Sequence, residues 1–220
     1  MVGAGHHAYP AQISLPKRRE AGYYAVKITV IFLAGNIGTG KTSLAKVLAD
    51  RLAIPHYEVD FVKKAVVSED SRLQWNVLHN LPFPEEARIK MFTRVVEDFA
   101  RLATDHPHLI VDETLHKEGP RQILLDGAVR YFGSYLMVLV EADEARIMER
   151  LMDSEREEHV LSDPMGMYHA IKREFDPFDR VDIRFKNNMA IDKAAARLER
   201  LIRERLEADA SAPPHPALPR

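Results

Sequence analysis

A glycine-rich loop between a short apolar run and an amphipathic run constrains this chain more than any other stretch. The loop reads GNIGTGKT over residues 35–42 and follows residues 28–34, which are apolar except for Thr29. Residues 43–52 then carry apolar side chains at helical spacing. A strand, a glycine loop and a helix in this order are the context in which G-x-x-x-x-G-K-S/T predicts a phosphate-binding loop.

The residue types of this loop suit a polyphosphate for physical reasons. Glycine has no Cβ to block an anion and adopts positive φ at little cost, so successive N–H groups can point inward. The helix that begins near Lys41 would aim the positive end of its dipole at the same place. We expect Lys41 to reach the β and γ oxygens and the Thr42 hydroxyl to bind Mg²⁺. The expected nucleotide-binding residues here are Gly35, Asn36, Ile37, Gly38, Thr39, Gly40, Lys41, Thr42 and Ser43.

Composition bounds the class of protein. The 220 residues correspond to about one α/β domain, and 46% of them are hydrophobic, enough for a substantial core. The formal net charge of -2 gives no whole-molecule attraction to nucleic acid or to a membrane surface. Cysteine is absent, which excludes disulfides, thiolate catalysis and cysteine-based zinc sites. No apolar run approaches the ~20 residues of a membrane span, and a signal peptide is not evident, so we expect a soluble, cytoplasmic protein.

The two ends differ from the middle. Residues 1–25 contain scattered glycine and proline and a basic triplet, Lys17 to Arg19, and we expect a flexible N-terminal extension. The triplet is either a docking arm for an anionic partner or a solvated run of charge. Residues 208–220 are rich in proline and alanine and are expected to form a disordered tail. The folded domain is therefore expected over residues 26–207.

Within this domain, short apolar runs alternate with longer amphipathic ones. This pattern predicts an α/β protein, a three-layer α/β/α sandwich with a five-stranded parallel sheet. The expected strands are 27–34, 55–60, 108–113, 135–141 and 181–186. The expected helices are 40–52, 84–104, 118–131, 143–152, 164–175 and 189–207. The less regular stretch before residue 84 either walls a substrate pocket or fills a core under a loop.

Carboxylates follow two of the expected strands. Asp60 ends the second strand, where it would either take a proton from a substrate hydroxyl, help to hold Mg²⁺ or cap the next helix. Asp112 ends the third strand and is expected to bind Mg²⁺ together with Thr42. The neighbouring Glu113 has two interpretations: it activates a water, which would make the protein an NTPase, or it supports a site whose acceptor is a substrate hydroxyl.

Cations near these acids complete the candidate site. Lys64 and Arg121 lie where they would contact an anionic or polar acceptor, although a solvated helix start also explains them. Phosphoryl transfer needs positive charge over the transferring group, and Arg150 and Arg156 are the natural donors from a small lid at about 150–165. The alternative for that segment is a helix laced with ion pairs between its turns.

These motifs resemble the small P-loop kinases related to nucleoside monophosphate, shikimate and gluconate kinases. More closely, the chain resembles the branch that includes zeta-toxin-like and chloramphenicol-phosphotransferase-like proteins. The resemblance covers residues 27 to about 205. It rests on residues 35–42, 59–61 and 111–114, Arg121, Arg150, Arg156, and on the Ser-Asp and Phe-x-Pro segments within 161–164 and 171–177.

The resemblance implies the fold of P-loop containing nucleoside triphosphate hydrolases and an ATP- and Mg²⁺-dependent phosphotransferase that acts on a hydroxyl of a small molecule. It implies Lys41 and Thr42 at the phosphates and Mg²⁺, and Asp60 as the base for the acceptor. It further implies lid cations at Arg150 and Arg156, an acceptor-facing Arg121, and Asn187 near the nucleotide base. The loop also resembles that of deoxynucleoside kinases, but their Asp-Arg-Ser-type signature is missing after the third strand.

Two alternatives stay open at this point. One is a P-loop ATPase or nucleotide-dependent switch that uses Glu113 to activate water, which the Asp-Glu pair after the third strand keeps possible. The other is a kinase that acts on a nucleotide or RNA end, with the basic triplet as an arm. The acceptor is undefined because specificity in such folds lies in loops such as 62–84.

Overall fold

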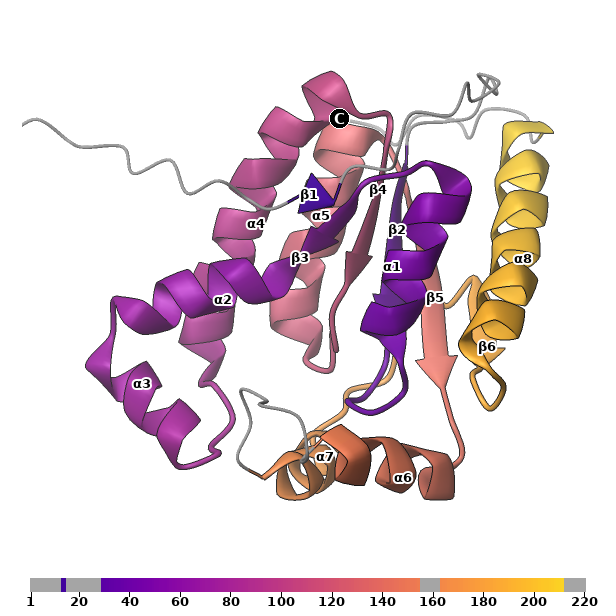
Figure 1. The fold of residues 1–220 in the computed structure, drawn as a ribbon. Helices are drawn as coiled ribbons and strands as arrows, with labels where there is room; N and C mark the ends of the chain where they lie inside the picture. Colours follow the sequence, from indigo (N-terminus) through magenta and orange to yellow (C-terminus); the bar gives the residue numbers. More distant parts are fainter. Residues whose placement is uncertain (1–12, 15–28, 155–162, 212–220) are drawn as a thin grey trace, which may run out of the picture.

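The computed structural model describes residues 13–14, 29–154 and 163–211, and these form a sheet with helices on both faces (Figure 1). The strands are β1 (Ile13–Ser14), β2 (Thr29–Ala34), β3 (His56–Glu58), β4 (His108–Asp112), β5 (Tyr135–Glu141) and β6 (Ile183–Lys186). The helices are α1 (Lys41–Leu52), α2 (Val59–Ser68), α3 (Ser71–Leu78), α4 (Glu85–Asp105), α5 (Glu118–Phe132), α6 (Glu144–Ser154), α7 (Pro164–Arg173) and α8 (Ile191–Ser211).

The sheet has the order β1-β3-β4-β2-β5-β6. β3, β4, β2, β5 and β6 are parallel to one another, which confirms the expected five-stranded parallel sheet. The short β1 adds an antiparallel edge through the pairing of Ile13 with Tyr57. β2 lies at the centre and all six of its residues are buried, as expected for a strand covered on both faces.

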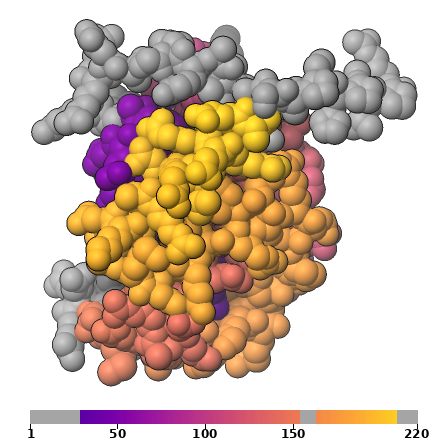
Figure 2. Space-filling view, turned by 90° about the vertical axis from the view of Figure 1, so that its right-hand side faces the viewer, coloured from indigo at the N-terminus to yellow at the C-terminus, as the bar shows by residue number. Residues whose placement is uncertain are grey.

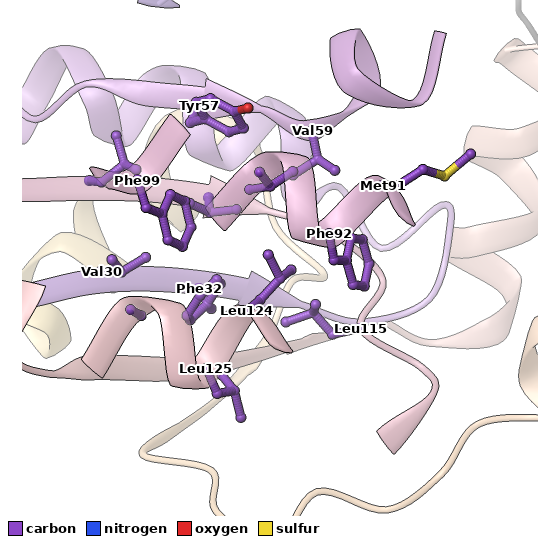
Figure 3. Packing of buried hydrophobic residues seen from close by; sticks show 14 of the residues in the cluster. Val30, Phe32, Tyr57, Val59, Met91, Phe92, Phe99, Leu115, Leu124 and Leu125 are labelled. Carbon is purple, nitrogen blue, oxygen red and sulfur yellow. The ribbon is translucent and has the colours of Figure 1, made fainter. Parts of the chain in front are cut away.

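Two apolar layers separate the sheet from its helices. Along β2, alternate residues face opposite sides: Val30 and Phe32 belong to the core cluster under α4 and α5, whereas Ile31 and Leu33 belong to the cluster under α1 and α8. Figure 3 shows the first layer, in which Phe32 lies near Leu124 of α5. The expected three-layer α/β/α sandwich is therefore confirmed. No helix in the described ranges is long and apolar enough to cross a membrane.

The largest local difference from expectation lies after β3. The strand expected at 55–60 ends at Glu58, and α2 begins at Val59, followed by α3, where an irregular stretch was expected. Val59, Val62 and Val66 recur at helical spacing and turn toward the core, which explains why the chain turns helical here. Asp60 therefore lies in the first turn of a helix rather than at the end of a strand, and there it complements the helix dipole.

Other expected boundaries are close to the observed ones. α8 continues to Ser211, past the expected end of the domain at residue 207. Within the expected N-terminal extension, the structure describes residues 13–14 alone, and these form β1. The rest of that extension, residues 155–162 of the expected lid, and residues 212–220 of the expected tail lie outside the described residues.

Gly35 fixes the sharp turn from β2 into the glycine loop. Its φ is 140°, and a Cβ built on it would lie 2.2 Å from the Val140 carbonyl oxygen of the neighbouring strand β5. We expect Gly35→Ala to lower the free energy of unfolding by more than about 2 kcal/mol, because strain and overlap add. Urea denaturation measures this change. Gly119→Ala is the control, since its Cβ would meet the flexible Glu85 side chain at 3.2 Å; an equal loss in both variants would contradict the expectation.

Candidate active site

Two pockets open where the parallel strands end, the edge of an α/β sheet at which ligands usually bind. The loop pocket, of about 760 Å³, is lined by the glycine loop, α6 and the start of α8. The side pocket, of about 350 Å³, is lined by α2, α3, α4, α7 and the residues after β4. Figure 2 shows a hollow between α6 and α8 with a patch in the indigo of the early residues. The two pockets share Ile37, Lys41, Thr42 and Asp60.

The glycine loop brings Lys41 to the boundary of the two pockets. Gly40 has φ 85° and caps α1, so that helix points its N-terminus into the loop pocket. The Lys41 ammonium donates to the Asn36 carbonyl oxygen at 2.8 Å, and the Thr39 hydroxyl donates to the same oxygen at 2.8 Å. Burial lowers the pKa of Lys41 to about 8, although Asp112 and Glu113 oppose that effect. An anion bound here would stabilise the charged lysine, as the phosphate-binding interpretation requires.

Thr42 and Asp112 lie side by side, as the sequence suggested. The Thr42 hydroxyl donates to Asp112 Oδ2 at 2.5 Å, and His56 Nε2 lies 2.5 Å from Oδ1 of the same carboxylate. Burial alone would raise the pKa of Asp112, but the hydrogen bond from His56 and its other partners hold it below the usual value. His56 is fully buried on β3, and no sequence motif predicted that it would contact Asp112.

These two oxygen donors fit Mg²⁺, which prefers hard oxygen ligands. Within the described ranges, histidine, aspartate and glutamate side chains do not gather in threes at a possible metal site. A nucleotide-bound Mg²⁺ needs no such group, because phosphates and water supply most of its ligands. The pair is therefore suited to a metal that arrives with a nucleotide.

Asp60 joins the site through a lysine. Lys63 Nζ lies 3.0 Å from Asp60 Oδ1 and also contacts the Glu113 carboxylate. The lysine lowers the pKa of Asp60, so that this carboxylate is ionised and free to accept a proton. The Asp60 side chain is 74% exposed, toward both pockets. Lys64, the expected substrate contact, lines the side pocket, but its ammonium lies over the Phe61 ring.

Glu113 is less available than Asp60. It is buried, and its carboxylate is held by Lys63 on one oxygen and by the Thr114 hydroxyl at 2.8 Å on the other. A group that activates water must have an oxygen free to accept that water's proton. The geometry therefore favours the supporting role for Glu113 over the water-activating one.

Arg88 and His116 extend this chain of contacts along the side pocket. His116 Nδ1 lies 3.1 Å from the Thr114 hydroxyl, and the imidazole also contacts the Arg88 guanidinium. Arg88 donates to the Phe83 carbonyl oxygen at 2.8 Å. The sequence analysis missed Arg88, and its one signal was a cation in the first turn of α4, where the helix dipole disfavours positive charge.

The pH dependence of stability tests the position of His116. Burial, together with Arg88 and Lys117, lowers the pKa of His116 from 6.5 to about 3. Its contribution to stability is therefore complete above about pH 6.5 and falls as the pH drops toward 3, because the unfolded chain takes up the proton first. At pH 5 the contribution of His116 to the free energy of unfolding has fallen by about 2 kcal/mol.

Between pH 7 and pH 5 the free energy of unfolding of the parent chain should therefore fall by about 2 kcal/mol more than that of His116→Gln. Urea unfolding at both pH values measures the difference, and comparing the two pH values cancels any loss that the substitution itself causes. His79→Gln is the control, because His79 is exposed and follows the last residue of α3. Equal pH-dependent losses in the parent chain and in His116→Gln would show that His116 is not held neutral.

Arg121 was expected to contact the acceptor, but the structure places its guanidinium under the segment after α7. Its guanidinium is buried and donates to the main-chain carbonyls of Leu115, Asp176 and Pro177. It also stacks on the Phe178 ring, 4.2 Å from its centroid. Arg121 lines neither pocket, because the segment after α7 folds over it. Its role is to tie that segment to the start of α5.

The expected lid cations have different outcomes. Arg150 lies on α6 beside the loop pocket, but its guanidinium donates to the Gly38, Thr39 and Asn187 carbonyl oxygens, so here it braces the glycine loop. Arg156 lies outside the described residues. A role for either over a transferring phosphoryl group stays a prediction.

Asn187 lies in the loop pocket, where a base contact was expected. Its amide nitrogen donates to the Thr39 carbonyl oxygen at 2.8 Å. The buried Oδ1 has no hydrogen-bond partner among the described residues. A contact between Asn187 and a nucleotide base stays a prediction.

A family model for an AAA domain matches residues 31–163, which is more than half of the chain. The chain belongs to this AAA-domain family. The match spans the glycine loop, Asp60 and Asp112, the features around which both pockets are built. No curated protein matches this AAA-domain chain by sequence.

Solved structures share the fold of this AAA-domain chain. A sugar kinase of Janibacter sp. has 17% identity and a TM-score of 0.64 over 84% of this chain and 98% of its own. A gluconokinase of Sinorhizobium meliloti has 18% identity and a TM-score of 0.65 over 83% of this chain and 96% of its own. An APS kinase of Mycobacterium tuberculosis in complex with AMPPNP and APS has 18% identity and a TM-score of 0.52 over 81% of this chain and 98% of its own. The chain therefore has the P-loop fold of these small kinases.

Proposed function

We propose that this AAA-domain chain is a Mg²⁺-dependent kinase that transfers the γ-phosphoryl group of ATP to a hydroxyl of a small molecule. The observation that carries the proposal is the junction of the pockets at Lys41, Thr42 and Asp60. ATP would bind in the loop pocket and the acceptor in the side pocket. Their reacting atoms would then meet between a phosphate-binding lysine and an ionised carboxylate, the positioning that phosphoryl transfer requires.

The chain's own residues supply most of the chemistry. The amides of the glycine loop and Lys41 hold the phosphates and stabilise the charge on the transferring group. Thr42 and Asp112 would hold Mg²⁺, which when bound neutralises phosphate charge and orients the phosphates. Asp60 accepts the acceptor's hydroxyl proton as the oxygen–phosphorus bond forms and ADP leaves. Lys63 keeps Asp60 ionised and in place.

The comparisons support this class of reaction. The structural neighbours include proteins titled as a sugar kinase, a gluconokinase and an APS kinase, the last with an ATP analogue bound. The proposal includes the finer resemblance to the zeta-toxin-like and chloramphenicol-phosphotransferase-like branch, which rests on the sequence motifs given above.

The ATPase alternative makes a different prediction about the acceptor. A kinase forms ADP rapidly only when an acceptor is present, whereas an ATPase that uses Glu113 forms it at the same rate without one. We expect ADP formation to depend on the acceptor across a panel of nucleosides, sugars, sugar acids and aromatic alcohols. Acceptor-independent ADP formation that Glu113→Gln abolishes would contradict the proposal.

The polynucleotide alternative depends on the basic triplet Lys17 to Arg19, which lies outside the described residues. Binding of a nucleic-acid end would weaken steeply as salt rises, because counterions are released from the phosphates. Acceptor binding that stays nearly constant between low and high salt would argue against this alternative.

A further inference from the structure

The side pocket also indicates which class of acceptor it takes. We infer that the acceptor is an amphipathic alcohol, with a hydroxyl at one end of an apolar body, and not a sugar or a sugar acid. The inference rests on the proposed function, since it assigns the side pocket to the acceptor.

The wall away from the glycine loop is apolar. It is built by side chains from α2, α3, the α3–α4 connection and α7, namely Val67, Val77, Leu81, Phe83, Met167 and Ile171. Figure 3 shows Met91, Phe92 and Leu115 at the end of the core toward which β2 points, and these residues line the pocket too. The pocket is therefore continuous with the hydrophobic core, and an apolar body inside it would extend that core.

The charged groups of the pocket, including Arg88 along its side, are largely paired with neighbouring side chains or with the main chain. Lys63 joins Asp60 to Glu113, and Asp112 is held by Thr42 and His56. These pairs leave few partners for additional hydroxyls along a ligand. A polyhydroxylated acceptor would place hydroxyls against hydrocarbon without hydrogen bonds, which is unfavourable, whereas a single hydroxyl beside Asp60 would be satisfied.

Leu81 and Leu78 provide a matched test of this wall. Leu81 lines the side pocket and is 42% exposed, so a polar side chain there is compatible with folding. Leu78, three residues earlier, is 74% exposed and does not line the pocket. A carboxylate at Leu81 would meet the apolar body of the acceptor, whereas a carboxylate at Leu78 would face water.

The experiment measures binding without nucleotide by calorimetry for 2-phenylethanol, 3-phenyl-1-propanol and 6-phenyl-1-hexanol, and for glucose and gluconate. We expect affinity to rise by about fourfold for each added methylene until the pocket is filled, because each buried CH₂ contributes a similar increment. Leu81→Asp should weaken binding of 6-phenyl-1-hexanol by about tenfold or more, and Leu78→Asp should leave it within about twofold. Glucose and gluconate should not bind measurably.

A second assay, transfer of labelled phosphate from ATP to the same compounds, separates this inference from the proposed function. Binding or phosphorylation of gluconate or glucose but not of the phenylalkanols would overturn the inference and leave the kinase intact. Phenylalkanol binding that Leu81→Asp weakens, with transfer to no compound in a wider acceptor panel, would support the apolar ligand and contradict the kinase. Absence of phenylalkanol binding would overturn the inference.

Discussion

Replacing Lys41 with alanine is expected to lower phosphoryl transfer by about a thousandfold or more while leaving the fold intact. The lysine is buried at the junction of the two pockets, and its ammonium donates a hydrogen bond to the Asn36 carbonyl oxygen. Its loss would remove the cation that meets the charge developing on the transferring group. The transfer rate with saturating ATP and acceptor measures the effect.

Lys46→Ala provides the matched control for Lys41→Ala. Lys46 lies on the same helix, α1, but its side chain is 58% exposed and its nearest acidic partner is Glu58 at 3.8 Å. Circular dichroism and thermal unfolding should be similar in both variants, and Lys46→Ala should retain full activity. A Lys41→Ala variant that folds and transfers phosphate normally would remove the glycine loop from the mechanism.

Replacing Asp60 with asparagine is expected to lower the maximal transfer rate by about 10²–10⁴-fold and to change ATP binding little. The asparagine keeps the size of the side chain but cannot accept the proton of the acceptor hydroxyl. Since Asp60 lies beside the loop pocket without being part of the glycine loop, the nucleotide loses few contacts. Initial rates and a separate ATP-binding titration measure the two quantities.

Asp50→Asn, on the exposed side of α1, controls for the loss of one negative charge and should leave both quantities unchanged. If Asp60→Asn weakens ATP binding as strongly as it slows transfer, Asp60 holds the metal or the fold and is not the base. A similar drop in both variants would indicate a general charge effect.

Much of the fold could be predicted because its signals are local. The glycine loop lies between a strand and a helix, and β2 is apolar after Thr29 because helices cover it on both faces. Thr42 and Asp112 could be paired in advance, because Thr42 ends the glycine loop that follows β2, and Asp112 ends β4, the parallel neighbour of β2.

The parts that could not be predicted depend on tertiary contacts. Two residues of β1 carry no periodicity, and their pairing with β3 is set by the edge of the sheet. Both Lys63 and Lys64 follow Asp60 in the sequence. The orientation of α2 places Lys63, and not Lys64, between the carboxylates of Asp60 and Glu113. A buried arginine such as Arg121 cannot be told from an exposed one by residue type, since its partners are carbonyl groups from a distant segment.

The fate of the γ-phosphate tests the central claim most directly. The chain would be incubated with ATP labelled in the γ-phosphoryl group, Mg²⁺ and an amphipathic alcohol such as 6-phenyl-1-hexanol, and with a broad panel of other hydroxyl compounds in parallel. We predict that label moves to the oxygen of an acceptor as a stable phosphate monoester, and that Lys41→Ala abolishes this product. Label found solely in inorganic phosphate, at a rate that no acceptor changes, would contradict the account.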